Sequence, residues 1–231
     1  MFIGFYSLAN SITLFGLALS VTSCFLAACG NIKFAIYLLF LACLCDMFDG
    51  KVARNGKKRS DAAKFYGVQL DSLCDIVSFG VTPCFIAFSF GFKGTLDIIV
   101  NLIFIICGVT RLAYFNTLAN ANPKAASKTF KGIPIPMSVF VVTFLFMLTT
   151  FIPANVSVWL FRLILLALAV GFILNISLKK PDYKQGMVLI AIEIIMLLIL
   201  VIAPDCKRFE SVTDNGADTE ISETESSDVS E

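Results

Sequence analysis

The chain has 231 residues, of which 58% are hydrophobic and 15% charged; its formal net charge is +1 and its mean hydropathy is +0.86. Soluble domains are about 45–50% apolar and about 25% charged, so this composition excludes an ordinary soluble domain and indicates a membrane protein. The chain contains no histidine, which excludes Ser-His-Asp hydrolysis, Cys-His nucleophiles and His-ligated zinc, so any catalysis must use carboxylates, cations or hydroxyl groups.

Seven apolar stretches are each long enough to cross about 30 Å of hydrocarbon as a helix, which takes roughly 20 residues. Helices satisfy their backbone hydrogen bonds internally, whereas open strands in lipid do not. We therefore expect an all-α fold, a polytopic membrane helix bundle of about seven transmembrane helices, with six or eight as alternatives. In chain order the stretches cover about 8–30, 32–50, 68–90, 95–115, 134–152, 156–177 and 186–203.

Basic residues predict how these helices are oriented. Thirteen of the eighteen lie in three segments, 51–66, 111–132 and 178–185. A seven-helix arrangement places these segments on one side of the membrane with the N-terminus, and the positive-inside bias identifies that side as the cytoplasm. Because residues 1–32 contain no lysine or arginine, the first stretch lacks the basic region of a cleavable signal peptide.

The composition changes after the last apolar stretch. From Asp205 to the end the net charge is −7, whereas the preceding 204 residues carry +8. The acidic segment has almost no large apolar side chains, which is typical of disordered chains. We expect a membrane domain over residues 1–203 and an acidic disordered tail over residues 204–231, on the side opposite the basic segments.

Four aspartates gather at the cytoplasmic ends of two predicted helices. Asp46 and Asp49 close the second helix, and Asp71 and Asp75 open the third. Spacings of three and four residues place each pair on one helical face. Carboxylates crowded together raise one another's pKa unless a cation lies between them. Oxygen ligands favour Mg²⁺ or Mn²⁺, with one or two ions bound and Ca²⁺ as a weaker alternative.

A structural alternative is that these aspartates are helix caps paired with nearby basic side chains, as charges at helix ends often are. The small residues beside the acidic pair argue against this alternative. Gly50 and Ala53 have small side chains, so they leave space on one helical face, as a site for a planar base or a diphosphate requires.

These residues form a motif found in a known family. The run Asp46-x2-Asp49-Gly50-x2-Ala53-Arg54, followed by Gly67-x3-Asp71-x3-Asp75, resembles the signature of the CDP-alcohol phosphatidyltransferases. Twelve residues separate Arg54 from Gly67, where the commonest family form has eight, and we expect the surplus to enlarge a cytosolic hairpin.

Other segments resemble the phosphatidylserine synthases within that family. LDSLCDIVSFGVTPC is similar to their third-helix motif, and RLAYFNT (111–117) and FKGIPIP (130–136) are similar to their fourth-helix end and the loop after it. The similar segments span about residues 46–136. Asn10 and Thr13 resemble the Asn-x-x-Thr of the family near the first helix.

The resemblance implies transfer of a phosphatidyl group from CDP-diacylglycerol to L-serine, giving phosphatidylserine and CMP. Asp46, Asp49 and Asp71 would hold the metal, and Asp75 would accept the serine proton and share the metal. The remaining candidates for substrate binding are Gly50 and Ala53 beside the cytidine, Gly67 in the motif, and Arg54, Arg111, Asn116 and Lys131.

Arg111 can bind a phosphate or the serine carboxylate through two parallel hydrogen bonds. The alternative is that Arg111 has no binding role and that its side chain extends to the membrane interface. Arg162 and Glu193 lie at membrane depth, too far apart to pair, and are expected to face the bundle or a partner subunit. The predicted partners are the two substrates and the lipid bilayer, with no nucleic acid; a homodimer is an open alternative to a monomer.

Two other functions stay open. A transferase of the same family could use glycerol 3-phosphate or an inositol phosphate, although such dianionic acceptors call for more basic residues. A small cation or substrate transporter would line its pathway with carboxylates. The acids, however, lie at one interface instead of the midplane, and the two halves of the chain share no pattern.

Overall fold

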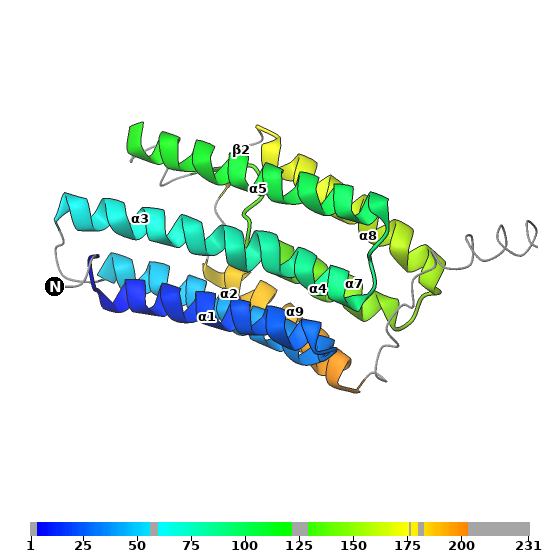
Figure 1. The fold of residues 1–231 in the computed structure, drawn as a ribbon. Coiled ribbons are helices and arrows are strands. Elements are labelled where there is room, and N and C mark those ends of the chain that lie inside the picture. The colour runs from blue at the N-terminus through cyan, green and yellow to red at the C-terminus, as the bar shows by residue number, and fades with distance from the viewer. Residues whose placement is uncertain (1–3, 56–59, 122–128, 176, 180–182, 203–231) are drawn as a thin grey trace, which may run out of the picture.

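The computed structural model describes residues 4–55, 60–121, 129–175, 177–179 and 183–202, and it is almost entirely helical (Figure 1). The helices lie at the positions of the seven predicted stretches, so the prediction of an all-α helix bundle is confirmed. In chain order the elements are α1 (Leu8–Ala28), α2 (Ile32–Asn55), α3 (Asp61–Asp75), the π-helical turn η1 (Ile76–Val81), α4 (Thr82–Phe90), α5 (Thr95–Ala121), β1 (Thr129–Lys131), α7 (Met137–Thr149), α8 (Ala154–Ile173), β2 (Ser177–Lys179) and α9 (Tyr183–Ile202).

Within the described ranges, four helices are long and apolar enough to cross a membrane: Leu8–Ala28, the continuous helix Asp61–Phe90, Thr95–Leu118 and Val156–Ile173. Two shorter apolar helices accompany them, Met137–Thr149 and Met187–Ile202. The remaining helix, α2, has 24 residues but carries charged side chains in its last turns. This pattern agrees with a polytopic membrane protein.

The N-terminal hairpin of α1 and α2 is the most closely packed pair of helices in the bundle. A Cβ atom on Gly16 would lie 3.1 Å from the Cβ of Cys45, so glycine allows the two backbones to approach. Near the turn, the buried Ser23 hydroxyl donates a hydrogen bond to the carbonyl oxygen of Ala35 at 2.7 Å. These contacts fix the position of α2 along α1, and with it the position of the aspartates near the end of α2.

The continuous helix of α3, η1 and α4 contains a wide turn directly after Asp75. Pro83 has no N–H group to offer the carbonyl oxygen of Phe79, four residues earlier. The Ser138 hydroxyl at the start of α7 donates a hydrogen bond to that oxygen at 2.7 Å, in the buried interior. The Thr82 hydroxyl donates to the carbonyl oxygen of Val77 at 3.0 Å. The wide turn is therefore stabilised by side chains from its own helix and from α7.

An ion pair that the sequence did not indicate joins α5 to α8. Arg162 Nε donates to Asp97 Oδ1 at 2.5 Å and Nη2 donates to Oδ2 at 3.2 Å. The guanidinium also lies 4.9 Å from the centroid of the Trp159 ring. Glu193 of α9 is fully buried, and neither of its carboxyl oxygens has a hydrogen-bond partner among the described residues. Both residues face the bundle, as expected, but the partner of Arg162 was missed.

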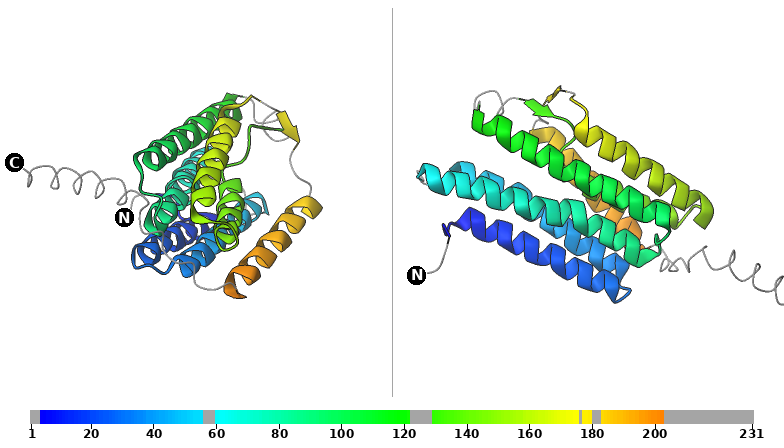
Figure 2. Two further views of the ribbon diagram at one scale, coloured as in Figure 1. Left: turned by 90° about the vertical axis from the view of Figure 1, so that its right-hand side faces the viewer. Right: turned by 45° about the horizontal axis from the view of Figure 1, so that its top comes forward.

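The sequence also did not predict β1 and β2, which form a short antiparallel ribbon. Phe130 pairs with Leu178, and Thr129 with Lys179. Strands of three residues are too short to show an alternating hydrophobic pattern. The ribbon brings the chain after α5 next to the chain after α8 (Figure 2).

The connections alternate between two ends of the bundle (Figure 1). The basic end holds the start of α1 and the ends of α2 and α5, and the β-ribbon and the start of α9 are set further in along the bundle from that end. The far end holds the α1–α2 turn, the α4–α5 turn and the end of α9. The described parts of the three predicted basic segments all lie on the half of the bundle nearer the basic end, as the seven-helix arrangement requires.

Candidate active site between α2 and α3

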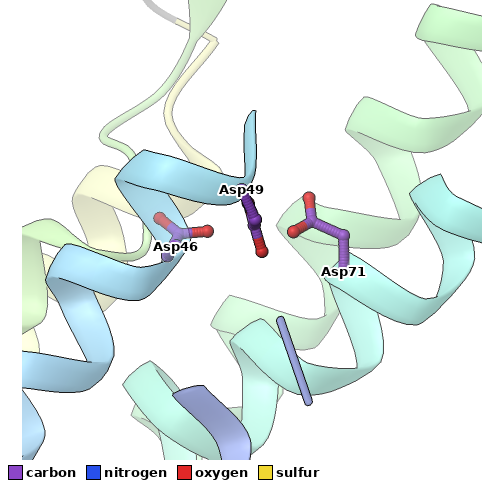
Figure 3. A group of neighbouring side chains, drawn as sticks. All are labelled: Asp46, Asp49 and Asp71. Carbon is purple, nitrogen blue, oxygen red and sulfur yellow. The ribbon is translucent and has the colours of Figure 1, made fainter. Parts of the chain in front are cut away.

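The acidic cluster comprises Asp46, Asp49, Asp71 and Asp75. Asp46 and Asp49 precede the end of α2 by nine and six residues, but Asp71 and Asp75 lie ten and fourteen residues inside the continuous helix Asp61–Phe90, not at its start as predicted, because that helix begins earlier than its apolar stretch. Asp46 and Asp49 project from α2, and Asp71 projects toward them from α3 (Figure 3). One carboxylate oxygen of each of these three residues lies within 4.8 Å of the others. Asp49 is only 3% exposed, and the other two are half-buried. The structure thus brings together residues separated by more than twenty positions in the chain.

Asp75 lies one helical turn beyond Asp71, and its carboxyl group lies close to that of Asp46. Carboxylates this close together repel one another unless a cation lies between them. A small cavity of about 10 Å³ lies beside Asp46, Asp49 and Asp75, and is also lined by Ser78 of η1. All four predicted carboxylates therefore converge on one place.

This arrangement fits a divalent cation bound by oxygen ligands. Two oxygens on opposite sides of Mg²⁺ are about 4.2 Å apart, and the observed spacing of up to 4.8 Å is close to that value. Among the described residues, no lysine or arginine forms an ion pair with any of the four aspartates. Lys64 pairs with Asp61, but the side chains of Arg54 and Lys57 lie outside the described residues, so the alternative of helix caps paired with basic side chains stays open.

A third helix, α1, also contributes to the cluster. The Thr13 hydroxyl donates a hydrogen bond to Asp49 Oδ2 and lies 3.1 Å from the carbonyl oxygen of Ala9. Asn10 is buried one turn earlier, and its side-chain amide donates to the carbonyl oxygen of Phe5 at 2.7 Å. Thr13 therefore orients a predicted metal ligand, whereas Asn10 anchors the start of α1.

The predicted substrate-binding residues of α2 and α3 surround the cluster. Gly50 follows Asp49 directly, and a Cβ atom placed on it would meet nothing within 4 Å. Ala53 is exposed and Gly67 is half-buried. The structure therefore leaves open space beside the acidic cluster on α2. The side chains of Arg54 and Lys131 lie outside the described residues, so their predicted roles stay predictions.

Arg111 of α5 lies behind Asp75, close enough to respond to its charge. It is only 7% exposed, and its Nε has no hydrogen-bond partner among the described residues. It also lines a cavity of about 220 Å³ with Tyr114 and the end of α8. A buried guanidinium whose Nε has no partner among the described residues can donate hydrogen bonds to a carboxylate or a phosphate. This burial argues against the alternative of a side chain that reaches the membrane interface, and substrate binding by Arg111 stays a prediction.

Asn116 lies one and a half turns beyond Arg111 on α5. Its side-chain amide donates a hydrogen bond to the Ser72 hydroxyl at 2.8 Å. Ser72 directly follows Asp71, so this bond sets the position of α5 against the acidic face of α3. In this structure Asn116 contacts Ser72, the neighbour of Asp71, and its contribution to the acidic cluster is to position α3. A substrate contact by its amide oxygen stays a prediction.

Three supporting residues were missed by the sequence analysis: Ser72, Thr82 and Ser138. A single serine or threonine in an apolar helix gives no periodic signal, and its partner is set by packing between helices. Pro83 was the available signal, because a proline inside a helix leaves the carbonyl oxygen four residues earlier in need of a donor.

Comparison with known proteins gives a consistent result. The family model for CDP-alcohol phosphatidyltransferase matches residues 6–175. The chain is 28% identical over 200 residues to the CDP-diacylglycerol--serine O-phosphatidyltransferase of Helicobacter pylori, covering 84% of this chain and 80% of that protein. It is 30% identical over 168 residues to the protein of the same name from Methanocaldococcus jannaschii, covering 72% of this chain and 73% of that protein.

A third relative of that name, from Saccharomyces cerevisiae, is 40% identical over 112 residues. That match covers 47% of this chain and 39% of the yeast protein, so the chain spans well under half of that relative. The matched family region contains the whole acidic cluster, Thr13 and Arg111. The chain therefore belongs to the CDP-alcohol phosphatidyltransferase family.

Proposed function

We propose that this integral membrane protein transfers the phosphatidyl group of CDP-diacylglycerol to the hydroxyl group of L-serine, giving phosphatidylserine and CMP. Two relatives that match most of the chain are named for this reaction. The observation that carries the chemistry is the acidic cluster, in which carboxylates from two helices come within 4.8 Å of one another.

The acidic cluster would hold Mg²⁺ or Mn²⁺ through Asp46, Asp49 and Asp71, with Asp75 sharing a ligand position. A cation bound there would neutralise the diphosphate of the donor and stabilise the departing CMP. The chain itself supplies a fixed set of acceptor oxygens, and Thr13 holds Asp49 in one orientation. The open space beside Gly50 and the small side chain of Ala53 would admit the cytidine.

Asp75 is proposed to take the proton from the serine hydroxyl as that oxygen bonds to the phosphorus and CMP leaves. A carboxylate held beside the reacting hydroxyl can serve as the general base of such a transfer. Arg111 lies near Asp75 and is proposed to bind the serine carboxylate. The acceptor would then be held with its hydroxyl group facing the base.

The position of the cluster suits these substrates. It lies on the half of the bundle that holds the end of α2, where the head group of a lipid donor can reach it from the membrane surface. Serine and CMP are water-soluble and need access from that side. The described parts of the three basic segments lie on the same half, which supports a cytoplasmic orientation of the site by the positive-inside bias.

Acceptor choice within the family is the main open alternative. Glycerol 3-phosphate and inositol phosphate are dianions and would need several cations. Among the described residues, Arg111 is the one buried cation near the acidic cluster. Serine is a zwitterion with one carboxylate, which one arginine can bind, so serine is favoured as the acceptor.

Release of CMP from CDP-diacylglycerol tests the proposal. The purified full-length protein is given the lipid donor with L-serine, glycerol 3-phosphate or inositol phosphate in turn. We expect rapid release with serine and release near the background level with the two phosphates. If CMP release depended on glycerol 3-phosphate or inositol phosphate and not on serine, the proposed acceptor would be wrong and the protein would be a different transferase of the same family.

A further inference from the structure

The side chain of Ile76, the first residue of η1, ends against two buried glycines. A Cβ atom placed on Gly80, four residues later, would lie only 2.8 Å from Ile76 Cδ1, which is closer than real Cβ atoms approach other heavy atoms. A Cβ atom on Gly108 of α5 would lie 3.3 Å from the same methyl group. Ile76 Cδ1 therefore fills space that a larger residue at either position would need. We call Ile76, Gly80 and Gly108 the isoleucine seat.

The two glycines of the isoleucine seat lie inside helical segments, Gly80 in η1 and Gly108 in α5. Glycine is less favourable than alanine at such positions. Neither glycine has a positive φ, so both backbone conformations would accept alanine. The contact with Ile76 Cδ1 is thus a reason for glycine at both positions that does not depend on backbone conformation.

Other segments close the isoleucine seat. A Cβ atom on Gly108 would also lie 3.8 Å from Ile135 Cδ1 and 3.9 Å from Phe172 Cε2. Ile135, just before α7, is fully buried, and Phe172 of α8 is almost completely buried. The methyl group of Ile76 thus meets α5 where α5 also meets α8 and the start of α7. In such a close-packed interior it has little free space into which to turn.

Ile76 directly follows Asp75, the proposed base. The wide turn begins at Ile76, and the hydrogen bond from the Thr82 N–H group to the carbonyl oxygen of Val77 spans five residues. Single π-helical turns of this kind are rare and occur frequently at functional sites. Because residues 75 and 76 share a peptide bond, a change in the backbone at Ile76 shifts the Asp75 carboxyl group relative to α2.

The proposed metal ligands are held by other contacts. Asp49 receives the hydrogen bond from Thr13 of α1, and Asp71 lies in the α-helical part of its helix, next to the Ser72 hydroxyl that Asn116 contacts. A change in the isoleucine seat should therefore move the proposed base more than these ligands. Displacement of a reacting group by about 1 Å can lower a rate by about 10²-fold.

We propose that Ile76 is a positioning residue for phosphatidyl transfer. Held by Gly80 and Gly108, it fixes the start of the wide turn. It thereby keeps the Asp75 carboxyl group at the small cavity that Asp75 shares with Asp46. The inference rests on the proposed function, in which Asp75 is the base. Ile76 acts through Asp75, so it should affect kcat more than the binding of CDP-diacylglycerol.

A size exchange within the isoleucine seat tests this proposal, with CMP release by the purified full-length protein as the assay. Gly80→Ala adds a methyl group where Ile76 Cδ1 lies and should lower kcat about tenfold, with the KM for CDP-diacylglycerol changed by less than about twofold. Ile76→Val removes Cδ1. Gly80→Ala combined with Ile76→Val should therefore recover to within about threefold of the wild-type kcat.

Gly94→Ala is the matched control. A Cβ atom on Gly94 would lie 2.9 Å from Asp97 Oδ2, near the α4–α5 turn, so the crowding is similar but lies away from Asp75. This variant should lower the midpoint of thermal unfolding and keep the wild-type kcat. Ile76→Val should not restore its stability.

Two results would overturn the proposal. The first is a wild-type kcat in Gly80→Ala. The second is a double variant that is no better than Gly80→Ala, either in kcat or in thermal unfolding, where the second measurement needs no activity. If Gly80→Ala does not fold, Gly108→Ala provides a milder contact with Ile76 Cδ1, and Ile76→Val should rescue it in the same way.

Failure of the proposed function would give a different result. If the wild type released CMP with a phosphate acceptor and not with serine, the acceptor would be wrong, and the same variants would be compared with that acceptor. If Asp75→Asn kept full turnover, both proposals would fail, because Ile76 would have no base to position. If Asp75→Asn lost turnover and Gly80→Ala did not, the positioning role of Ile76 alone would be wrong.

Discussion

Asp75 differs from the other aspartates of the acidic cluster in its neighbours. It contacts the carboxyl group of Asp46 on one side and lies near the guanidinium of Arg111 on the other. Asp46, Asp49 and Asp71 form the closest group of ligand oxygens. These positions are the basis for proposing that Asp46, Asp49 and Asp71 chiefly hold a cation and that Asp75 acts on the acceptor.

Replacement of Asp75 by asparagine should separate the two roles. We expect Asp75→Asn to keep metal-dependent binding of CDP-diacylglycerol and to lose about 10²–10⁴-fold in turnover, because no group accepts the serine proton. Asp46→Asn and Asp71→Asn should lose donor affinity as well. Donor binding and CMP release are measured for each variant. An equal loss of donor binding in all three would mean that Asp75 is chiefly a metal ligand.

Thr13 gives a second prediction at the scale of a residue. Thr13→Val removes the hydrogen bond to Asp49 and should lower turnover about tenfold, since hydrogen bonds to charged groups are worth roughly 1.5–3 kcal/mol. The Mg²⁺ concentration needed for half-maximal activity should rise, whereas Thr13→Ser should restore both values.

Thr22→Val is the control for Thr13. Thr22 lies on the same helix, is exposed, and donates only to the carbonyl oxygen of Ala18. It should leave the Mg²⁺ requirement unchanged. If Thr13→Val lowered thermal stability alone and left the Mg²⁺ requirement at the wild-type value, its role would be structural.

At the scale of an element, the wide turn η1 connects the acidic half of its helix to the buried half. Ser138→Ala should destabilise the protein by about 1–3 kcal/mol, because the buried carbonyl oxygen of Phe79 loses its donor. Pro83→Ala restores a backbone N–H group four residues after Phe79. In the Pro83→Ala protein, Ser138→Ala should therefore lower the free energy of unfolding by less than it does in the wild type.

Thermal unfolding of the two single variants and the double variant measures this coupling. The loss of stability in the double variant should be smaller than the sum of the losses in the two single variants, since both substitutions act on the same carbonyl oxygen. Strictly additive losses would mean that Ser138 stabilises the helix by packing alone.

The elements also explain what the sequence could and could not predict. Long apolar runs and paired aspartates at helical spacing leave a strong periodic signal, so all seven helices and the convergence of Asp46, Asp49, Asp71 and Asp75 were predicted. The partners of Arg162, Ser138 and Asn116 were not. Each of these contacts joins residues more than forty positions apart, and which helix meets which is decided by packing.

At the scale of the whole molecule, charge and chemistry gather on one half of the bundle. The acidic cluster lies on the same half of the bundle as the described parts of the basic segments, whereas the Asp97–Arg162 pair lies toward the other end, near the α4–α5 turn. The acidic tail at residues 204–231 lies outside the described residues, so its predicted disorder stays a prediction, as does the homodimer.

The metal dependence of serine-driven CMP release tests the central claim most directly. We expect a chelator to abolish release by the wild-type protein, and added Mg²⁺ or Mn²⁺ to restore it, because the four carboxylates need a cation to bind the diphosphate. Asp49→Asn should lose about 10²–10³-fold at saturating Mg²⁺, the scale of one electrostatic contact in a transition state. Full activity in metal-free buffer, or an unimpaired Asp49→Asn variant, would contradict the assignment of the acidic cluster as the active site.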